Sequence, residues 1–347
     1  MHTKIIKIDK DNFKDEDLKE AASIIKEGGL VAFPTETVYG LGANGLEESS
    51  IKKIYKAKGR PSDNPLILHI GKKDGIYPLV KEVPDLALEL MEEFWPGPLT
   101  IILEKSDLVP SIITGGLQTV AIRMPQHPIA RRLIELSGVP IAAPSANISG
   151  KPSPTSGRDV IEDMEGKIAA VIDGGPTGIG LESTVLDLSG EKPMVLRPGG
   201  IGIEELRRVA GNVGQDDSIL DKDKLPKSPG QKYRHYAPEA EMVVFKGNLD
   251  CIIESINDYV EGSPLKDERI GIMATDESKD HYPKGLVKSL GSRKNKRTIA
   301  LNLFKTIREF DRIGVDVILS EGVQLDDIGM AIMNRMMKAS GGKSIDC

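Results

Sequence analysis

Short runs of β-branched and aliphatic residues alternate with helix-like segments over the first 212 residues of the chain. Helical patterns are expected over residues 15–29, 48–58, 84–94, 127–137 and 156–165. The expected strands are LVAFPT, PLILHI, LTIILE, TVAIRM, VPIAAPS, AAVIDGG, STVLDLS and PMVLRPG. The last two strands follow each other without room for a crossover helix, which parallel neighbours would need. The alternation therefore predicts an α/β domain whose sheet is mixed rather than purely parallel.

Residues 213–240 interrupt this pattern with a polar stretch rich in turn formers, QDDSILDKDKLPKSPGQ, which is typical of a linker. Beyond it, the strand-like runs EMVVFKG, ERIGIMATD, LVKSLG and VDVILSEG alternate with helical patterns at 248–260, 298–313 and 327–339. A length of 347 residues also favours more than one core. We therefore expect an α/β domain over 1–212, a linker over 213–240, and a smaller doubly wound, Rossmann-like α/β domain over 241–347.

Charge and cysteine content exclude several classes of protein. The formal net charge of −6 argues against bulk attraction to nucleic acid or to an anionic membrane. Cys251 and Cys347 fit neither a disulfide framework nor a zinc site. The charged N-terminus lacks a signal-peptide core, and no run of 18 or more apolar residues occurs. We expect a soluble, cytoplasmic protein without membrane partners.

Common nucleotide and hydrolase fingerprints are missing from the sequence. It contains no G-x-x-x-x-G-K-[ST] loop, no H-E-x-x-H and no G-x-S-x-G, and its G-x-G-x-x-G match, GLGANG at residues 40–45, does not directly follow a predicted strand. A nucleotide site in this chain must therefore be built from other elements.

One polar cluster follows an early predicted strand, and a second follows the next predicted helix. PTETVYGLGA places Thr35 and Thr37 directly after a strand, although a turn with internally bonded hydroxyls would explain them equally well. KAKGRPSDNPLILHI presents Lys58 and Arg60 from a loop before Pro61, because the residue preceding proline avoids the helical conformation. Solvated surface charge is the alternative interpretation of those two cations.

Two further clusters lie at later strand ends. Arg123 in QTVAIRMP ends a strand and needs an anionic partner, which either the protein or a ligand could supply. The serine-rich segment APSANISGKPSPTS, residues 143–156, is suited to phosphate or carboxylate oxygens through its amides and hydroxyls. LESTVLDL and VLRPGG add Ser183 and Arg197 near other strand ends. Such ends are where α/β folds usually bind ligands.

The motifs and their order along the chain resemble those of the YrdC-type family of threonylcarbamoyl-AMP synthases. The motifs are PTETVYGLGA, K-x-R-P with N-P-L, AIRMP, S-A-N-x-S-G and STVLD…LRPG. The resemblance covers about residues 20–205, and the second domain resembles the long, two-domain branch. It implies an N-terminal YrdC-like twisted sheet. It also implies a reaction in which L-threonine, bicarbonate or CO2, and ATP give threonylcarbamoyl-adenylate and pyrophosphate. A partner transferase then uses the product to modify tRNA.

The resemblance also implies roles for particular residues. It assigns threonine binding to Thr35 or Thr37, His69, Arg123 and Ser183. It assigns ATP binding to Lys58, Arg60, Asn64, Thr119, Ser145, Asn147, Ser153 and Arg197, with Lys58 and Arg60 acting in catalysis. We expect Mg2+ as cofactor, held mainly by the ATP phosphates and water rather than by a protein metal site.

The linker carries an unusual segment, SPGQKYRHYAP, residues 228–238, and the long branch of the family has a similar segment between its domains. We expect it to act as a lid through Lys232, Arg234, His235 or Tyr236, shielding the labile adenylate from water. A plain linker is the alternative.

Two other functions remain open at this point. YrdC-like domains resemble RNA-binding modules, so an RNA-binding or tRNA-docking protein is the main alternative, and direct tRNA binding is left undecided. A carbamoyltransferase of the hydrogenase-maturation type is a third possibility, but the CxxC patterns expected of its zinc fingers are missing. For the second domain we expect a role in stabilising or positioning the first.

Overall fold

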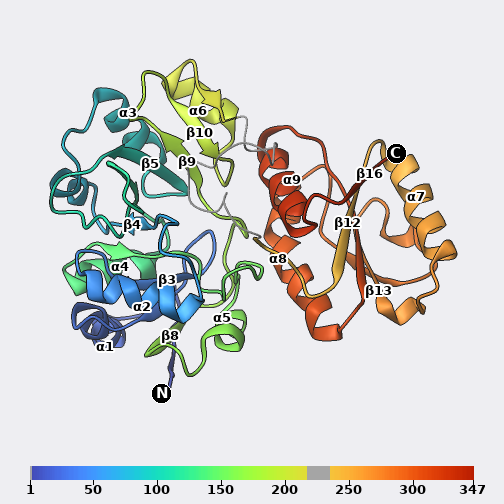
Figure 1. Cartoon of the computed structure of the whole chain (residues 1–347), viewed down its shortest axis with the longest axis horizontal. Coiled ribbons are helices and arrows are strands. Elements are labelled where there is room, and N and C mark those ends of the chain that lie inside the picture. The colour runs from blue at the N-terminus through green and yellow to red at the C-terminus, as the bar shows by residue number, and fades with distance from the viewer. Residues whose placement is uncertain (1, 217–234) are drawn as a thin grey trace. The chain divides into compact units, whose positions relative to one another are not determined.

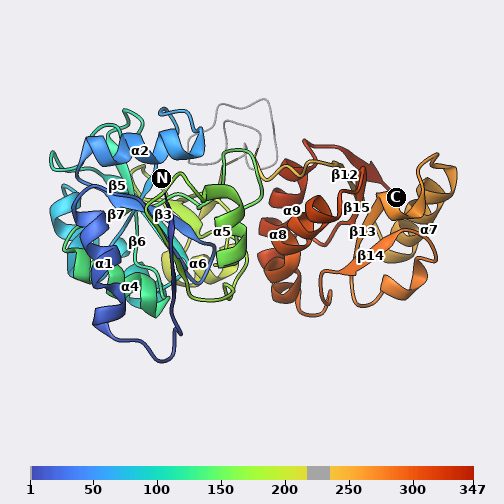
Figure 2. The ribbon, with the colours of Figure 1, turned by 90° about the horizontal axis from the view of Figure 1, so that it is seen from below.

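The computed structural model describes residues 2–216 and 235–347. The described chain divides into two compact units, drawn in Figure 1 and, from another side, in Figure 2. Residues 235–347 belong to the second unit, together with the short segments 150–152 and 179–181. The rest of the described chain forms the first unit. Within the described residues, no helix has the length and apolar character needed to cross a membrane.

A mixed sheet is the centre of the first unit, as the sequence predicted. Its strand order is β1 (Lys4–Lys7), β8 (Ala170–Asp173), β2 (Val31–Phe33), β3 (Gly40–Asn44), β7 (Ile141–Ala142), β4 (Ile67–His69), β6 (Thr119–Arg123), β5 (Leu99–Glu104), β9 (Thr184–Asp187), β10 (Met194–Arg197) and β11 (Gly214–Gln215). The β4–β6 and β5–β9 pairs are parallel, whereas β5–β6 and β9–β10 are antiparallel. The close spacing of β9 and β10 in the sequence indicated the antiparallel pair correctly.

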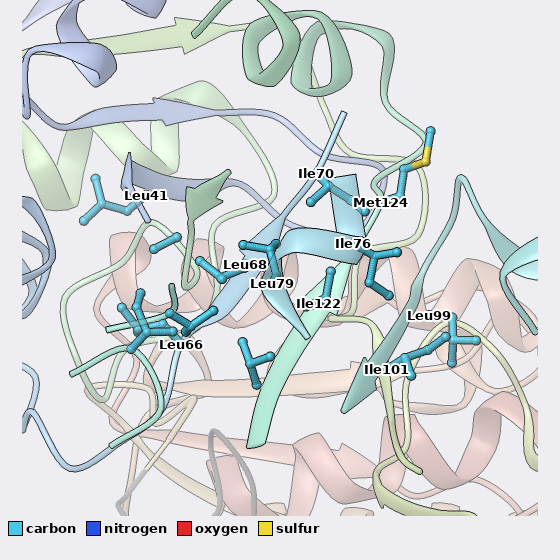
Figure 3. Close-up of a cluster of buried hydrophobic side chains, with 14 of the residues drawn as sticks. Leu41, Leu66, Leu68, Ile70, Ile76, Leu79, Leu99, Ile101, Ile122 and Met124 are labelled. Carbon is cyan, nitrogen blue, oxygen red and sulfur yellow. The ribbon is translucent and has the colours of Figure 1, made fainter. Parts of the chain in front are cut away.

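Helices cover both faces of this sheet. The first unit contains α1 (Asp15–Lys26), α2 (Glu48–Lys58), α3 (Asp85–Phe94), α4 (Pro128–Ser137), α5 (Gly157–Met164) and α6 (Ile203–Ala210). One buried cluster joins α1 and α4 to Val31 and Phe33 of β2, while Ala32 belongs to the cluster under the other helices. This division follows from the alternation of side chains along a strand. Figure 3 shows part of the second cluster, including Leu41 and Ile122.

The structure differs from the sequence predictions at several element ends. The short strands β1 and β3 and the helix α6 were not predicted, and β11 lies in the stretch where we expected the linker to begin. Gly214 and Gln215 pair with Met194 and Val195 of β10, so the first residues after 213 still extend the sheet.

The second unit is a parallel, doubly wound domain. Its strand order is β14 (Leu286–Ser289), β13 (Ile270–Ala274), β15 (Val317–Glu321), β12 (Glu241–Lys246) and β16 (Ser344–Asp346), and each of these pairings is parallel. The helix α7 (Leu249–Gly262) packs on Phe245 and Ile272 in one cluster. On β13, Gly271 faces α8 (Lys296–Ile313), because a Cβ there would meet the ring of Phe310 at 2.8 Å. The last helix, α9 (Asp327–Ala339), packs against α8.

Candidate functional site

The ends of adjacent strands bring several predicted residues together in the first unit. The β4–β6 register pairs His69 with Arg123, and the β5–β6 register pairs Arg123 with Thr100. Because β9 lies on the other side of β5, Ser183 just before β9 is close to Thr100, and their hydroxyl oxygens are 2.7 Å apart. The sheet order therefore explains why residues far apart in sequence meet.

Arg123 is buried and has a protein anion as its partner. Its Nη2 lies 2.6 Å from Glu36 Oε1, its Nη1 donates to Thr37 Oγ1 at 2.9 Å, and its Nε donates to the Gly97 carbonyl at 3.2 Å. The arginine is 4% exposed. The sequence left open whether a protein group or a ligand supplies the negative charge, and the structure identifies Glu36.

Glu36 was missed by the sequence reasoning. It lies between the two threonines of PTETV, whose hydroxyls are the more evident candidates for ligand binding. The signal that could have found it is electrostatic, because a buried arginine at one strand end requires a carboxylate at a neighbouring one.

The two threonines form a hydrogen-bonded chain that ends at the arginine. Thr35 Oγ1 donates to the Val38 carbonyl at 2.6 Å and lies 2.8 Å from Thr37 Oγ1. Thr37 therefore donates to Thr35 while accepting from Arg123. Of the two threonines, Thr37 is the one in contact with the guanidinium.

A second buried network surrounds Ser183. Arg197 donates from Nη2 to Ser183 Oγ and from Nε to the Ser183 carbonyl, both at 3.1 Å. Thr100 Oγ1 completes this network and is fully buried. Thr100 was also missed by the sequence reasoning, since it is the one polar residue inside the apolar run LTIIL.

His69 is held neutral by its surroundings. Burial and then the nearby Arg123 charge lower its pKa to about 3. Its Nδ1 has no hydrogen-bond partner in the described part of the chain. A buried polar nitrogen without a partner commonly marks the place of a ligand or a water molecule.

Lys58 is the last residue of α2 and is buried, so the prediction that it lies in a loop was wrong, as was the alternative of solvated surface charge. It ties the end of this helix to the serine-rich segment. Its Nζ donates to the carbonyl oxygens of Ser145 at 2.6 Å and Asn147 at 2.5 Å, and it is 1% exposed. Ser145 Oγ in turn donates to Asn147 Oδ1 at 2.5 Å. Gly59 ends the helix in the left-handed conformation, with φ of 61°. The structure thus brings Lys58, Ser145 and Asn147 together.

Four further predicted nucleotide-binding residues lie in three different places. Arg60 Nη2 lies 3.5 Å from the carbonyl oxygen of the buried Asn64, and Ser153 Oγ donates to Glu182 Oε1 at 2.6 Å. Thr119 begins β6 whereas Arg123 ends it, so the strand separates the two by about 13 Å. Thr119 can belong to the same site only if the ligand is extended.

The predicted lid residues are only partly within the described chain. Lys232 and Arg234 lie outside the described residues. His235 and Tyr236 belong to the second unit and are buried, and the Tyr236 ring lies 5.0 Å from that of Phe304. Across residues 2–216 and 235–347, no group of three or more His, Cys, Asp or Glu residues could hold a metal ion.

The fold and these contacts define a two-unit α/β protein with buried cations and hydroxyls at the strand ends of its first unit. A family profile described as "Telomere recombination" (Sua5, YciO and YrdC) matches residues 23–199, and one described as the C-terminal domain of threonylcarbamoyl-AMP synthase matches residues 201–341. The chain belongs to the threonylcarbamoyl-AMP synthase family.

Relatives match the chain over nearly its whole length. Threonylcarbamoyl-AMP synthase of Pyrococcus abyssi is 51% identical over 94% of this chain and 95% of its own, and that of Bacillus subtilis is 48% identical over 95% of both chains. A crystal structure of P. abyssi Sua5 complexed with L-threonine is similar, with a TM-score of 0.91 at 48% identity over 100% of both chains. These matches cover both units.

Proposed function

We propose that this protein joins L-threonine, bicarbonate or CO2, and ATP to form L-threonylcarbamoyladenylate and pyrophosphate, as a nucleotidyltransferase. The observation that carries the proposal is the buried set of cations and hydroxyls at the strand ends, found in a chain 51% identical to a threonylcarbamoyl-AMP synthase over 94% of its length. The similar P. abyssi structure contains L-threonine, which supports threonine as the amino acid.

The amino-acid end of the site is proposed to lie around Arg123. A guanidinium binds a carboxylate strongly through paired N–H donors, which suits the threonine carboxylate. Thr37 offers a hydroxyl bonded to that guanidinium, and Ser183 offers one bonded to Thr100, the residue opposite Arg123 in the β5–β6 register. His69, neutral and with a free ring nitrogen, is suited to the threonine hydroxyl.

The nucleotide end is proposed to use Lys58, Arg60 and the serine-rich segment. The threonine nitrogen, after losing a proton, attacks the carbon of CO2 to give a carbamate. A carbamate oxygen then attacks the α-phosphorus, and the bond between that phosphorus and the bridging oxygen breaks to release pyrophosphate. Attacker and target are both anions, so fixed cations lower the barrier by offsetting their repulsion. Positioning of the two substrates supplies much of the remaining rate.

Mg2+ is proposed as the cofactor, carried into the site by the ATP phosphates. The donors around Lys58 and Ser145 are cationic and hydroxylic, which suits a metal held chiefly by phosphate oxygens and water. The ion would supply positive charge on the phosphates, while the residues named here bind and orient the nucleotide.

The proposed reaction also implies a partner enzyme, a cellular compartment and a lid. The adenylate is labile, so a transferase that passes the threonylcarbamoyl group to tRNA is the expected consumer. ATP and tRNA are both cytoplasmic, and we place the reaction there. Residues 228–238 are proposed to act as a lid, and deleting Gly230–Pro238 should reduce retention of the adenylate. Because that deletion also removes the buried His235 and Tyr236, replacing only Lys232 and Arg234 with alanine is the variant that leaves the second unit intact.

The test is to incubate the protein with ATP, Mg2+, L-threonine and labelled bicarbonate. A labelled threonylcarbamoyl-adenylate should form, with pyrophosphate released only when threonine is present. Absence of threonine-dependent pyrophosphate would overturn the proposal. If the protein is instead an RNA-binding module, filter binding of tRNA should be tight and should weaken steeply as salt rises.

A further inference from the structure

Arg123 and Glu36 form a buried ion pair next to the residues proposed to bind threonine. The pair joins Arg123 Nη2 to Glu36 Oε1 at 2.6 Å, and the two side chains are 5% and 10% exposed. Water screens such a pair weakly, so both charges act strongly on any group that enters beside them. If the pair served stability alone, the two side chains would need no partner beyond each other.

Both side chains of the pair can form further hydrogen bonds. A guanidinium carries five N–H donors, and the contacts of Arg123 within the described residues use three of them. On Glu36, Oε2 has only one contact to a described residue, the His127 backbone N–H at the long distance of 3.4 Å. A carboxylate oxygen can accept more than one hydrogen bond, so Oε2 is the least satisfied atom of the pair.

Other buried polar atoms near Glu36 also lack partners. His127 Nδ1 and Thr177 Oγ1 have no hydrogen-bond partner within residues 2–216 and 235–347, and both residues are buried. His127 contacts Glu36 through its backbone nitrogen, and Thr177 precedes Gly178, whose N–H donates to the Glu36 carbonyl. Buried polar groups are normally bonded, so a group of them without partners indicates a polar ligand or water that the protein is built to receive.

An amino acid in its zwitterionic form fits this arrangement. Its carboxylate and ammonium are joined through one carbon, so the molecule is a short dipole. The Arg123–Glu36 pair is a second short dipole, and the two can lie side by side with opposite charges facing each other. We propose that Glu36 binds the α-ammonium of the amino-acid substrate while Arg123 binds its carboxylate. The proposal rests on the proposed function, since it adds a specificity-determining residue to the same site.

This assignment gives Glu36 a role in selecting amino acids over hydroxy acids. Without Glu36, the site would still hold a cation for a carboxylate but no anion for the ammonium. With Glu36, a ligand that lacks the amine leaves Glu36 Oε2 without a cation and brings a second carboxylate to Arg123, whose single positive charge must then balance both. Specificity of this kind arises because an unpaired buried charge is costly.

The experiment measures binding without ATP, by calorimetry on the full chain, for three ligands. These are L-threonine, L-threoninol, which lacks the carboxylate, and 3-hydroxybutyrate, which lacks the amine. In Glu36→Gln, affinity for L-threonine should fall on the order of ten- to hundred-fold, the range for a lost hydrogen bond between charged groups. Affinity for 3-hydroxybutyrate should stay equal or rise, because the negative charge next to Arg123 is gone.

Two results would overturn the proposal. An equal loss for L-threonine and 3-hydroxybutyrate would mean that Glu36 only positions Arg123. A gain for L-threonine would mean that Glu36 competes with the substrate carboxylate. Glu104→Gln is the matched control, since Glu104 is in an exposed pair with Lys81 at 3.2 Å and should change neither affinity.

Further measurements keep the test independent of folding and of the proposed reaction. Glu36→Asp keeps the charge and should retain more threonine affinity than Glu36→Gln. In the unaltered protein, L-threoninol should displace labelled L-threonine, and failure to do so would contradict ammonium recognition even if both variants unfold. Selective binding of L-threonine without adenylate formation would leave this inference standing while removing the proposed function.

Discussion

The ammonium of Lys58 lies 2.5 Å from the carbonyl oxygen of Asn147 and 2.6 Å from that of Ser145. One buried cation therefore fixes two backbone groups of the serine-rich segment. The lysine that we expect to face the nucleotide phosphates also shapes the loop around them, so its loss should affect both activity and stability.

We predict that Lys58→Met abolishes threonine-dependent pyrophosphate release and lowers the free energy of unfolding by about 1–3 kcal/mol. Methionine keeps much of the apolar stem but leaves the two carbonyls without their donor. Pyrophosphate release and urea unfolding measure the two effects. Lys56→Met, an exposed change on the same helix, should alter neither. Near-normal turnover in Lys58→Met would remove the phosphate role.

Arg60→Ala is predicted to separate activity from stability. Arg60 is only partly buried, and its contact with the Asn64 carbonyl oxygen, at 3.5 Å, is weak. We expect pyrophosphate release to be lost while the midpoint of urea unfolding stays close to that of the unaltered protein. Unfolding of the variant, or full activity, would contradict the assignment of Arg60 to the nucleotide.

Much of the fold could be predicted from the sequence because its periodic elements are regular. The α2 helix and the β5 strand have the predicted bounds, and the β9–β10 pair follows from its short connection. The strand β3 was missed because GLGAN contains two glycines, which are depleted in strands. It forms because its neighbours β2 and β7 supply the packing that the local sequence does not indicate.

The site could be predicted as a set of residues but not as a set of contacts. His69 and Arg123 are distant in sequence, and only the β4–β6 register makes them neighbours. The same holds for Thr100 and Ser183, which meet across β5 and β9. Glu36 shows the limit most clearly, because the sequence predicted that Arg123 needs an anion but not which residue the sheet brings to it.

Stability is predicted to depend on pH through His69. An exposed histidine in the unfolded chain protonates near pH 6.5, whereas burial and Arg123 lower the pKa of His69 to about 3 in the folded protein. Between these values the unfolded chain binds the extra proton. The stabilisation is therefore complete above pH 6.5 and is lost as the pH falls toward 3, by at most about 1.4 kcal/mol per pH unit.

The variant His69→Gln should show a shallower fall in the free energy of unfolding than the unaltered protein between pH 6.5 and 4. His127, whose pKa burial also lowers to about 4, is present in both proteins, so its contribution cancels in the comparison. Urea unfolding at several pH values gives the two slopes. Parallel slopes would mean that His69 is accessible to protons in the folded state.

Gly199→Ala is predicted to disrupt the Ser183 network through the backbone. A Cβ at residue 199 would lie 2.4 Å from the Glu182 carbonyl oxygen and 2.4 Å from the Ser183 carbonyl carbon, neither of which is a flexible side-chain end. The strand end must therefore shift, which weakens the Arg197–Ser183 bonds. We expect a loss of about 1–3 kcal/mol in the free energy of unfolding, as for overpacking, together with weaker threonine binding.

Gly190→Ala provides the matched control for this prediction. Gly190 lies in the loop between β9 and β10, a Cβ there meets nothing within 4 Å, and its φ lies outside the left-handed region. Alanine should keep or slightly raise stability at this position by restricting the unfolded chain. Calorimetric threonine binding and urea unfolding on both variants distinguish the effects. If Gly199→Ala behaves like Gly190→Ala, then the backbone next to Ser183 does not need the close approach that glycine permits.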